Sequence, residues 1–233
     1  MNEPILTCRG LTKLYGSMPA INELTVDIFK GKIVGLLGPN GSGKTTLIKL
    51  AAGLLQPSSG VLTVSGMPVG VETKKRVSYL PDRDYLPGNM RARELLKMFS
   101  DFYEDFDQQK AIEMLSRLGI DLSKRFRTMS KGTREKVQLS LVMSRQADLY
   151  LLDEPIAAVD PAARDYILRT VIQNYKEGST VLISTHLIAD VEPVLDDVLM
   201  MQNGTIRLYG PAAGIRAEAG KSIDMLFREV YQC

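Results

Sequence analysis

Several residue types are scarce in this chain of 233 residues: it has no tryptophan, one histidine and two cysteines. Cys8 and Cys233 stand near opposite ends without metal-type spacing, which is typical of a protein from a reducing compartment. No apolar run approaches the roughly 20 residues that a membrane-spanning helix needs. The first ten residues also lack the basic start and apolar stretch of a signal peptide. We therefore expect a soluble protein of the cytoplasm.

Net charge is small as well, because 29 Lys and Arg face 27 Asp and Glu, a balance of +2. A nearly neutral chain has no overall electrostatic attraction for nucleic acid, and we expect no nucleic-acid partner. Hydrophobic residues at 45% and charged residues at 24% are ordinary for a globular fold, which excludes disorder and collagen-like repeats. The length suits a single domain with a core of ordinary size.

Short apolar segments alternate with helical patterns along the chain. The expected strands are Ile5–Arg9, Leu24–Phe29, Lys32–Leu37, Val61–Ser65, Arg76–Leu80, Leu149–Leu152, Thr180–Ser184, Val198–Gln202 and Thr205–Tyr209. Asn203-Gly204 between the last two indicates a hairpin. Leu149–Leu152 and Thr180–Ser184 are brief, apolar and followed by helical sequence, as parallel strands covered on both faces are. The alternation predicts an α/β fold with a parallel sheet and a nucleotide at its carboxyl edge.

The strand signal disappears between Asp82 and Ala147, where three helices are expected at Ala92–Phe102, Gln108–Leu118 and Thr133–Arg145. A helical lobe at about 82–146 is therefore inserted between strands of the sheet. The rest, about 1–81 and 147–233, forms the core, and both parts belong to one domain spanning 1–233. The tail resumes a helical pattern at Pro211–Ala219 and Ile223–Val230.

A glycine-rich segment follows the expected strand that ends at Leu37 and precedes a helix. It fits G-x-x-x-x-G-K-[ST] and comprises Gly38, Pro39, Asn40, Gly41, Ser42, Gly43, Lys44 and Thr45, with Thr46 next. Glycines let backbone N–H groups curl around an anion, and the helix N-terminus adds its positive dipole. Lys44 reaches the β- and γ-phosphates, and the Thr45 hydroxyl is a ligand for Mg²⁺. The alternative is a chance glycine-rich turn, which the strand–turn–helix context disfavours.

Two carboxylates, Asp153 and Glu154, follow the apolar strand Leu149–Leu152. A carboxylate at the end of a buried strand would lie across from the phosphate loop, where Asp153 holds Mg²⁺ or its water. Glu154 points elsewhere and is suited to act as general base for an attacking water. The alternative is a helix cap, which Pro155 and the later start of the next helix make weak.

Further motifs make the sequence resemble the ATP-binding cassette (ABC) family, the nucleotide-binding subunits of membrane transporters. Met129-Ser130-Lys131-Gly132-Thr133 is similar to the family's signature, normally Leu-Ser-Gly-Gly-Gln, and Ala157-Ala158-Val159-Asp160 is similar to its D-loop. Tyr15 precedes the phosphate loop where the family has an aromatic residue, and His186 stands at the position of the switch histidine. The order of these motifs covers nearly the whole chain.

The resemblance implies a P-loop NTPase fold with a parallel core sheet, an N-terminal antiparallel β subdomain and the inserted helical lobe. It implies that Tyr15 stacks on adenine, where the alternative is a core aromatic. His186 would contact the γ-phosphate, where the alternative is a structural histidine. Ser130 and Gly132 would face the γ-phosphate held by an opposite subunit, and Ser130 can cap its helix at the same time. Asp160 would belong to the same shared site, and the cofactors would be ATP and Mg²⁺.

Three positions depart from the family pattern. Asp82 stands where the family has glutamine, and a carboxylate there could still be a ligand for Mg²⁺ but adds negative charge near the phosphates. Lys131 replaces a signature glycine, so it either adds a cation near the shared γ-phosphate or points to solvent. Thr133 replaces the signature glutamine. None of these changes affects Lys44, Asp153, Glu154 or His186, so we expect an active ATPase that forms ADP and phosphate.

The resemblance implies an ATPase subunit, paired with itself or a second ABC subunit and docked on a separate permease at the cytoplasmic side of the membrane. The short C-terminal region resembles exporters of drugs, peptides or antibiotics. Phe99, Phe102, Tyr103 and Phe106 at helical spacing are either one packed face of a helix or the lining of a groove for a permease helix. The alternative function is a soluble ABC ATPase that acts on DNA or the ribosome. A regulator that does not hydrolyse ATP is disfavoured by Glu154 and His186.

Overall fold

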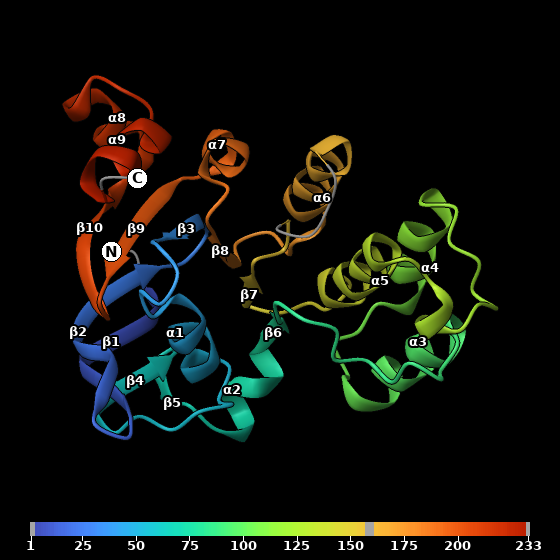
Figure 1. The fold of residues 1–233 in the computed structure, drawn as a ribbon. Helices are drawn as coiled ribbons and strands as arrows, with labels where there is room; N and C mark the ends of the chain where they lie inside the picture. The colour runs from blue at the N-terminus through green and yellow to red at the C-terminus, as the bar shows by residue number, and fades with distance from the viewer. Residues whose placement is uncertain (1–2, 157–160, 232–233) are drawn as a thin grey trace.

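Two β-sheets organise the fold (Figure 1), which the computed structural model describes for residues 3–156 and 161–231. The larger sheet has the order β10-β9-β3-β8-β7-β6 in the described residues. Its strands are β3 (Ile33–Leu37), β6 (Val77–Leu80), β7 (Leu149–Asp153), β8 (Thr180–Thr185), β9 (Asp197–Gln202) and β10 (Thr205–Pro211). All neighbours pair in parallel except β9 and β10, which form the hairpin predicted at Asn203-Gly204.

The smaller sheet is antiparallel and has the order β2-β1-β4-β5 in the described residues. Its strands are β1 (Pro4–Tyr15), β2 (Met18–Phe29), β4 (Ser59–Val64) and β5 (Met67–Pro68). The predicted α/β fold with a parallel core sheet and an N-terminal antiparallel β subdomain is thereby confirmed. Several strands run longer than their apolar segments, because ladder pairing continues through polar residues at both ends.

The larger sheet is buried on both faces, and alternate residues of each strand belong to different cores. Val34 and Leu36 of β3 pack with the smaller sheet and α1 (Lys44–Ala51). Ile33 and Leu37 pack on the opposite face with residues of α6 (Pro161–Asn174) and α9 (Ile223–Tyr231). Burial on both sides explains why β3 and β7 are almost entirely apolar and why every residue of β8 is buried. The strands are rigid supports for whatever follows their carboxyl ends.

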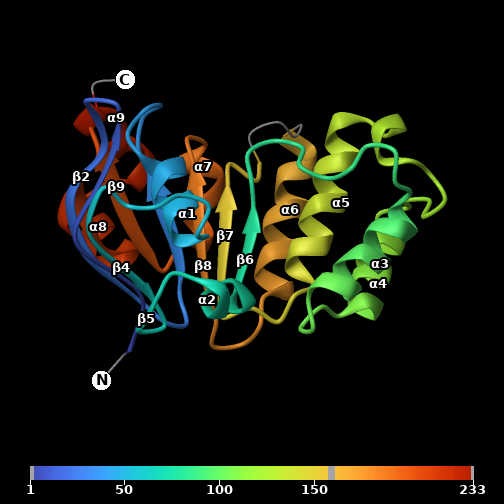
Figure 2. The same ribbon diagram turned by 90° about the horizontal axis from the view of Figure 1, so that it is seen from below.

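The helical lobe lies beyond β6, at the edge of the larger sheet (Figure 2). It comprises α3 (Ala92–Phe102), α4 (Gln108–Arg117) and α5 (Lys131–Met143), with a short 3-10 turn at Phe126–Thr128. These helices follow β6 and precede β7 in the chain, and they enclose a core of their own. None of the helices in the described ranges is long and apolar enough to cross a membrane.

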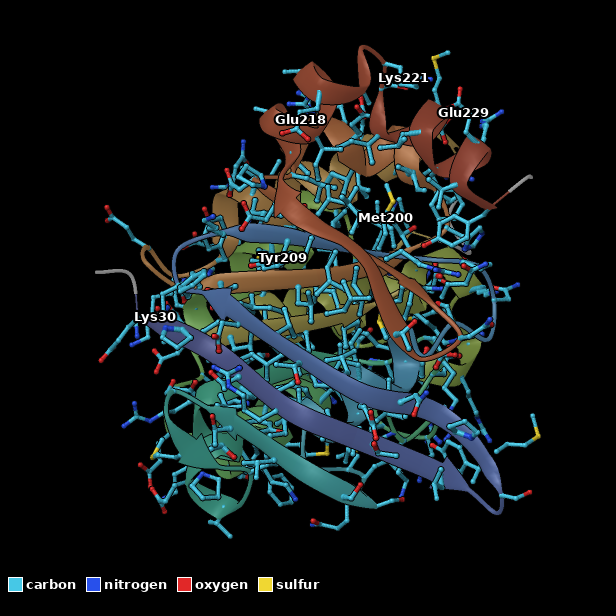
Figure 3. The ribbon with its side chains drawn as sticks, turned by 90° about the vertical axis from the view of Figure 1, so that its left-hand side faces the viewer. Lys30, Met200, Tyr209, Glu218, Lys221 and Glu229 are labelled. Carbon is cyan, nitrogen blue, oxygen red and sulfur yellow. The ribbon has the colours of Figure 1, made fainter. Side chains whose placement is uncertain are left out.

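The C-terminal segment packs beside β9 and β10 as α8 (Ala212–Ala219) and α9. Figure 3 shows these helices stacked above the strand that carries Tyr209. Lys221 and Glu229 form an ion pair of 2.7 Å. The short helices α2 (Val71–Arg76) and α7 (Ile188–Val191) complete the fold, with a 3-10 turn at Glu192–Val194. Neither α2 nor β5 was expected, because both are too short to show a periodic pattern.

Two expectations about the lobe need correction. The helix expected at Thr133–Arg145 begins two residues earlier, because the Ser130 hydroxyl accepts the N–H of Thr133 and caps it. The four aromatics do not share a helix face, because α3 ends at Phe102 and the last two lie beyond it. Phe99 contacts Tyr103 and Phe106 with ring centroids 5.4 Å apart in each pair, whereas Phe102 is 77% exposed.

Candidate phosphate-binding and catalytic site

Four parallel strands end at one edge of the larger sheet, and the predicted site residues follow those ends. The phosphate loop follows β3, Asp82 follows β6, Asp153 and Glu154 stand at the end of β7, and His186 follows β8. In Figure 2 the arrows of β6, β7 and β8 point to this edge together. The sheet therefore brings together residues that are far apart in the sequence.

The phosphate loop, residues 38–45, curls into a backbone shape that requires glycine at two points. Gly43 has a φ of 106°, and a Cβ there would lie 2.5 Å from the carbonyl oxygen of Ala20. A Cβ on Gly38 would lie 2.5 Å from the carbonyl oxygen of Met201. Gly43 is also the N-cap of α1, so the first free N–H groups of that helix open into the loop. This geometry suits an anion.

Lys44 is folded into the same loop and is 7% exposed. Its Nζ donates to the carbonyl oxygens of Gly38 at 2.7 Å and Pro39 at 3.1 Å. Burial lowers the pKa of the Lys44 ammonium, while the charges of Glu154 and Asp153 raise it. A phosphate would supply the negative charge that two neutral carbonyls lack. Lys44 thus lies where the sequence predicts a phosphate contact.

A pocket of about 320 Å³ opens at this loop. It is lined by Ala20, Asn40, Gly41, Ser42, Gly43, Lys44, Thr45, Thr46, Asp82 and Glu154. The Ser42 hydroxyl is buried and has no hydrogen-bond partner within the described chain. The pocket combines backbone N–H donors, one ammonium and two carboxylates, a set that suits a phosphate chain together with a divalent cation.

Asp153 lies at the bottom of the site and is 1% exposed. Its Oδ1 accepts hydrogen bonds from the hydroxyls of Ser184 at 2.6 Å and Thr45 at 3.0 Å. Burial raises the pKa of the Asp153 carboxyl most, its two hydrogen bonds lower it, and the charges of Asp82 and Glu154 raise it further. Nearby positive charge would keep this carboxyl ionised.

The second oxygen of Asp153, Oδ2, is buried and has no hydrogen-bond partner among the described residues. Leaving such an oxygen unsatisfied is costly. A hard cation bound by Asp153 and the Thr45 hydroxyl would satisfy it with the oxygen ligands that Mg²⁺ prefers. The predicted ligands Thr45 and Asp153 therefore fit Mg²⁺, and Asp82 faces the same pocket from the end of β6.

Glu154, which follows β7, and His186, which follows β8, contact each other at the same edge of the sheet. His186 Nδ1 lies 2.9 Å from Glu154 Oε2, and the side chains are 50% and 17% exposed. Glu154 has a φ of 52°, an uncommon value for a residue other than glycine. Its N–H donates to the carbonyl and hydroxyl oxygens of Ser184, each at 3.1 Å, which holds the turn in place. A strained residue so held at a strand end is typical of a functional site.

Tyr15 and the signature segment, residues 129–133, are separate from this pocket. The Tyr15 ring is 51% exposed at the end of β1, with Lys13 Nζ 5.7 Å from its centroid, so the core alternative is wrong. Ser130 and Lys131 are exposed at the start of α5, and a Cβ on Gly132 would meet open space. Asp160 lies outside the described residues.

Sequence reasoning missed Ser184, which connects Asp153 to the backbone of Glu154. Its only signal was its position at the end of a strand beside Leu149–Leu152. It also missed Asp84, Arg134 and Gln138, which form a hydrogen-bonded cluster next to Asp82. A glutamine within the apolar second half of a helix could have drawn attention to that cluster.

Known proteins resemble this chain in both sequence and fold. The ABC transporter family model matches residues 21–157. The chain is 34% identical over 233 residues to YdbJ, an uncharacterised ABC transporter ATP-binding protein of Bacillus subtilis, covering 96% of this chain and 74% of that protein. It is 28% identical to the linearmycin resistance ATP-binding protein LnrL of Bacillus subtilis, covering 93% of this chain and 72% of that one.

Solved structures share the fold over most of their length. The structure of an ATP-binding subunit of an ABC transporter matches with a TM-score of 0.88 and 28% identity, covering 97% of this chain and 99% of that one. A dimeric, post-hydrolysis structure of the ATP-binding cassette MJ0796 with ADP and phosphate matches with a TM-score of 0.78 and 18% identity, covering 88% and 98%.

Proposed function

The chain belongs to the ABC transporter family, and from this membership we propose that it hydrolyses ATP to drive a membrane exporter of drugs, peptides or antibiotics. The observation that carries the ATPase proposal is the contact of 2.9 Å between Glu154 and His186 at a pocket lined by Lys44 and Thr45. A carboxylate so placed can take a proton from a water that attacks a phosphate in the pocket.

The phosphates of ATP would lie in the loop at residues 38–45, where Lys44 exchanges its carbonyl partners for phosphate oxygens. Glu154 would accept the proton of the attacking water, and His186 would orient Glu154 and contact the γ-phosphate. Thr45, Asp153 and Asp82 would hold Mg²⁺, which supplies charge neutralisation to the phosphates when bound. Tyr15 would stack on adenine from the end of β1.

Two copies would form a head-to-tail dimer, with Ser130 and Gly132 of one copy facing the γ-phosphate held by the other. The exposure of Ser130 at the N-terminus of α5 supports this arrangement, because free helix N–H groups attract phosphate. Asp160 is assigned to the same interface from the family resemblance. The dimeric cassette with the same fold is consistent with such pairing.

The permease would dock in a groove of about 530 Å³ between the core and the helical lobe. Four aromatic side chains line it, namely Tyr79, Tyr85, Phe99 and Tyr103. The Tyr79 hydroxyl is buried without a hydrogen-bond partner in the described chain, so a polar group of the partner could satisfy it. This placement would hold the chain at the cytoplasmic side of the membrane. The name of the linearmycin resistance relative supports antibiotic export.

Purification of the tagged chain from solubilised membranes tests the transporter proposal. We expect a protein with several membrane-spanning helices to accompany it, and ATPase activity to be lost in Glu154→Gln. Recovery with ribosomes or DNA instead would favour the soluble alternative, which the names of the relatives do not support. A complex that contains the permease but hydrolyses no ATP would contradict the enzymatic part alone.

A further inference from the structure

Three polar side chains join the loop after β6 to the signature helix α5, and we name them the Asp84 clamp: Asp84, Arg134 and Gln138. Asp84 Oδ2 accepts a hydrogen bond from Arg134 Nε at 2.6 Å, and Oδ1 accepts one from Gln138 Nε2 at 3.0 Å. The oxygen of the same amide accepts the backbone N–H of Tyr85 at 3.2 Å. The oxygen and the nitrogen of the Gln138 amide therefore each form a hydrogen bond with the loop.

The Gln138 amide is buried, and both of its hydrogen bonds within the described chain go to this loop. The residue is 2% exposed and lies between the buried Val137 and Leu139. A buried amide costs stability unless both ends form hydrogen bonds, and here both partners come from the loop. The pairing also fixes the amide orientation, because Tyr85 N–H can only donate and the Asp84 carboxylate can only accept.

The clamp holds the loop two residues after Asp82. Asp82 lines the phosphate pocket together with Thr45 and Glu154, yet it is exposed and has no hydrogen-bond or ion-pair partner within the described residues. The pocket that Asp82 lines holds both a carboxylate, Glu154, and an ammonium, Lys44. The place of Asp82 at the pocket therefore depends on the backbone of its loop and not on a contact of its own side chain.

We propose that Asp84, Arg134 and Gln138 are positioning residues that hold Asp82 at the pocket as a ligand for Mg²⁺. The inference rests on the proposed binding of ATP with Mg²⁺, and it adds the residues that position one of the metal ligands. Because α5 begins at the Ser130 cap, the clamp also joins the loop of Asp82 to the helix that follows the signature segment. Because the loop is already ordered, binding of the metal would cost little conformational entropy in the loop backbone.

Binding of a fluorescent ATP analogue, mant-ATP, tests this without relying on turnover. Its dissociation constant is measured once with excess Mg²⁺ and once with EDTA. The value in EDTA divided by the value with Mg²⁺ reports how much the metal strengthens binding. We expect Gln138→Leu, of similar size, to reduce the ratio about tenfold, as loss of an outer-shell partner does, with binding in EDTA unchanged. Arg134→Gln, on the half-buried side of the clamp, should reduce it less and guards against a folding defect.

Two comparisons separate positioning from mere stability. Arg9→Gln breaks a similar ion pair, Arg9–Asp27 at 2.7 Å in the smaller sheet, and should leave the ratio unchanged. In an Asp82→Ala background, Gln138→Leu should lower the ratio by less than a further factor of about two, because the effects of coupled residues are not additive. A full additional loss there, or equal weakening with and without Mg²⁺, would overturn the inference. Wild-type protein that binds mant-ATP equally in both conditions would also overturn it, whereas protein that never binds mant-ATP would contradict the proposed function itself.

Discussion

At the phosphate pocket, Asp153 is 1% exposed and Lys44 is 7% exposed. Lys44 donates to two carbonyl oxygens of its own loop, and Asp153 accepts hydrogen bonds from hydroxyls of two other segments. At the signature segment, Ser130 is exposed and its hydroxyl contacts only Thr133, three residues along the same helix. Both regions offer backbone N–H groups at a helix N-terminus, from α1 and α5 respectively.

The difference lies in how complete each region is within one chain. The pocket draws its residues from four strands, so a single chain can bind phosphates there. In the signature segment, Met129 is buried in the core of the lobe, whereas Ser130 and Lys131 are exposed and the Ser130 hydroxyl bonds only within its own helix in the described residues. Under the proposed head-to-tail dimer, a second chain would bring a ligand to it. Four substitutions probe this contrast.

Lys44→Ala should have the largest effect, because it damages the region that works in a single chain. Removing the ammonium takes away charge-assisted hydrogen bonds to phosphate, and ATP affinity should fall by about a hundredfold. ATP-dependent dimerisation and turnover should disappear with it. Isothermal titration with ATP checks binding, and retained affinity would show that Lys44 stays with the Gly38 and Pro39 carbonyls.

Ser130→Arg should abolish turnover and leave binding intact, because the added bulk lies where a second chain's phosphate would approach. Titration of ATP into the monomeric variant should give the wild-type dissociation constant, while the ATPase assay reads zero. The matched control is Ser100→Arg on α3, outside the signature segment, which should hydrolyse ATP normally. Normal hydrolysis by Ser130→Arg would rule out a shared site.

Glu154→Gln should reduce hydrolysis by at least about a hundredfold, the lower range for losing a general base. The change also removes one negative charge near the γ-phosphate, so ATP should stabilise the dimer. Light scattering after size exclusion, with and without ATP, measures the second effect. Normal hydrolysis by a monomeric variant would assign the base elsewhere, with His186 as the next candidate.

Asp82→Ala should have the smallest effect, a loss of about tenfold in turnover, which corresponds to about 1.4 kcal/mol of transition-state stabilisation. The residue is exposed at the rim of the pocket and shares the proposed metal with Asp153 and Thr45. Steady-state assays at saturating Mg²⁺ measure the loss. Turnover equal to the wild type would limit Asp82 to a structural or partner-facing role.

Sequence patterns predicted the phosphate pocket better than the lobe, for physical reasons. Glycine spacing, an apolar strand and a terminal carboxylate are local features, so Lys44, Asp153 and their supporting strands could be located directly. The fold class followed from the alternation of strands and helices. The convergence of four strand ends could be expected from parallel pairing, but the 2.9 Å contact between Glu154 and His186 could not be.

The lobe was harder because its contacts are not periodic. Three helices were expected, yet Tyr103 and Phe106 lie beyond the end of α3 and reach Phe99 through a turn. The Asp84 clamp depends on a loop residue meeting α5 across fifty residues of chain, which no spacing rule contains. Tertiary pairing of polar side chains is therefore the part that sequence patterns leave open.

The pairing of β3 has a consequence for how the chain is made. Ile33 pairs with Val181 of β8, and Val34 pairs with Asp197 of β9, so the strand that supports the phosphate loop finds its neighbours only late in synthesis. Such distant pairing is slow, because the intervening chain must first be ordered. On the ribosome, β3 has no paired neighbour in the larger sheet until β8 emerges, and its second neighbour, β9, follows later. A ligand that needs the assembled loop would therefore stabilise the chain only after β3 has paired with its neighbours.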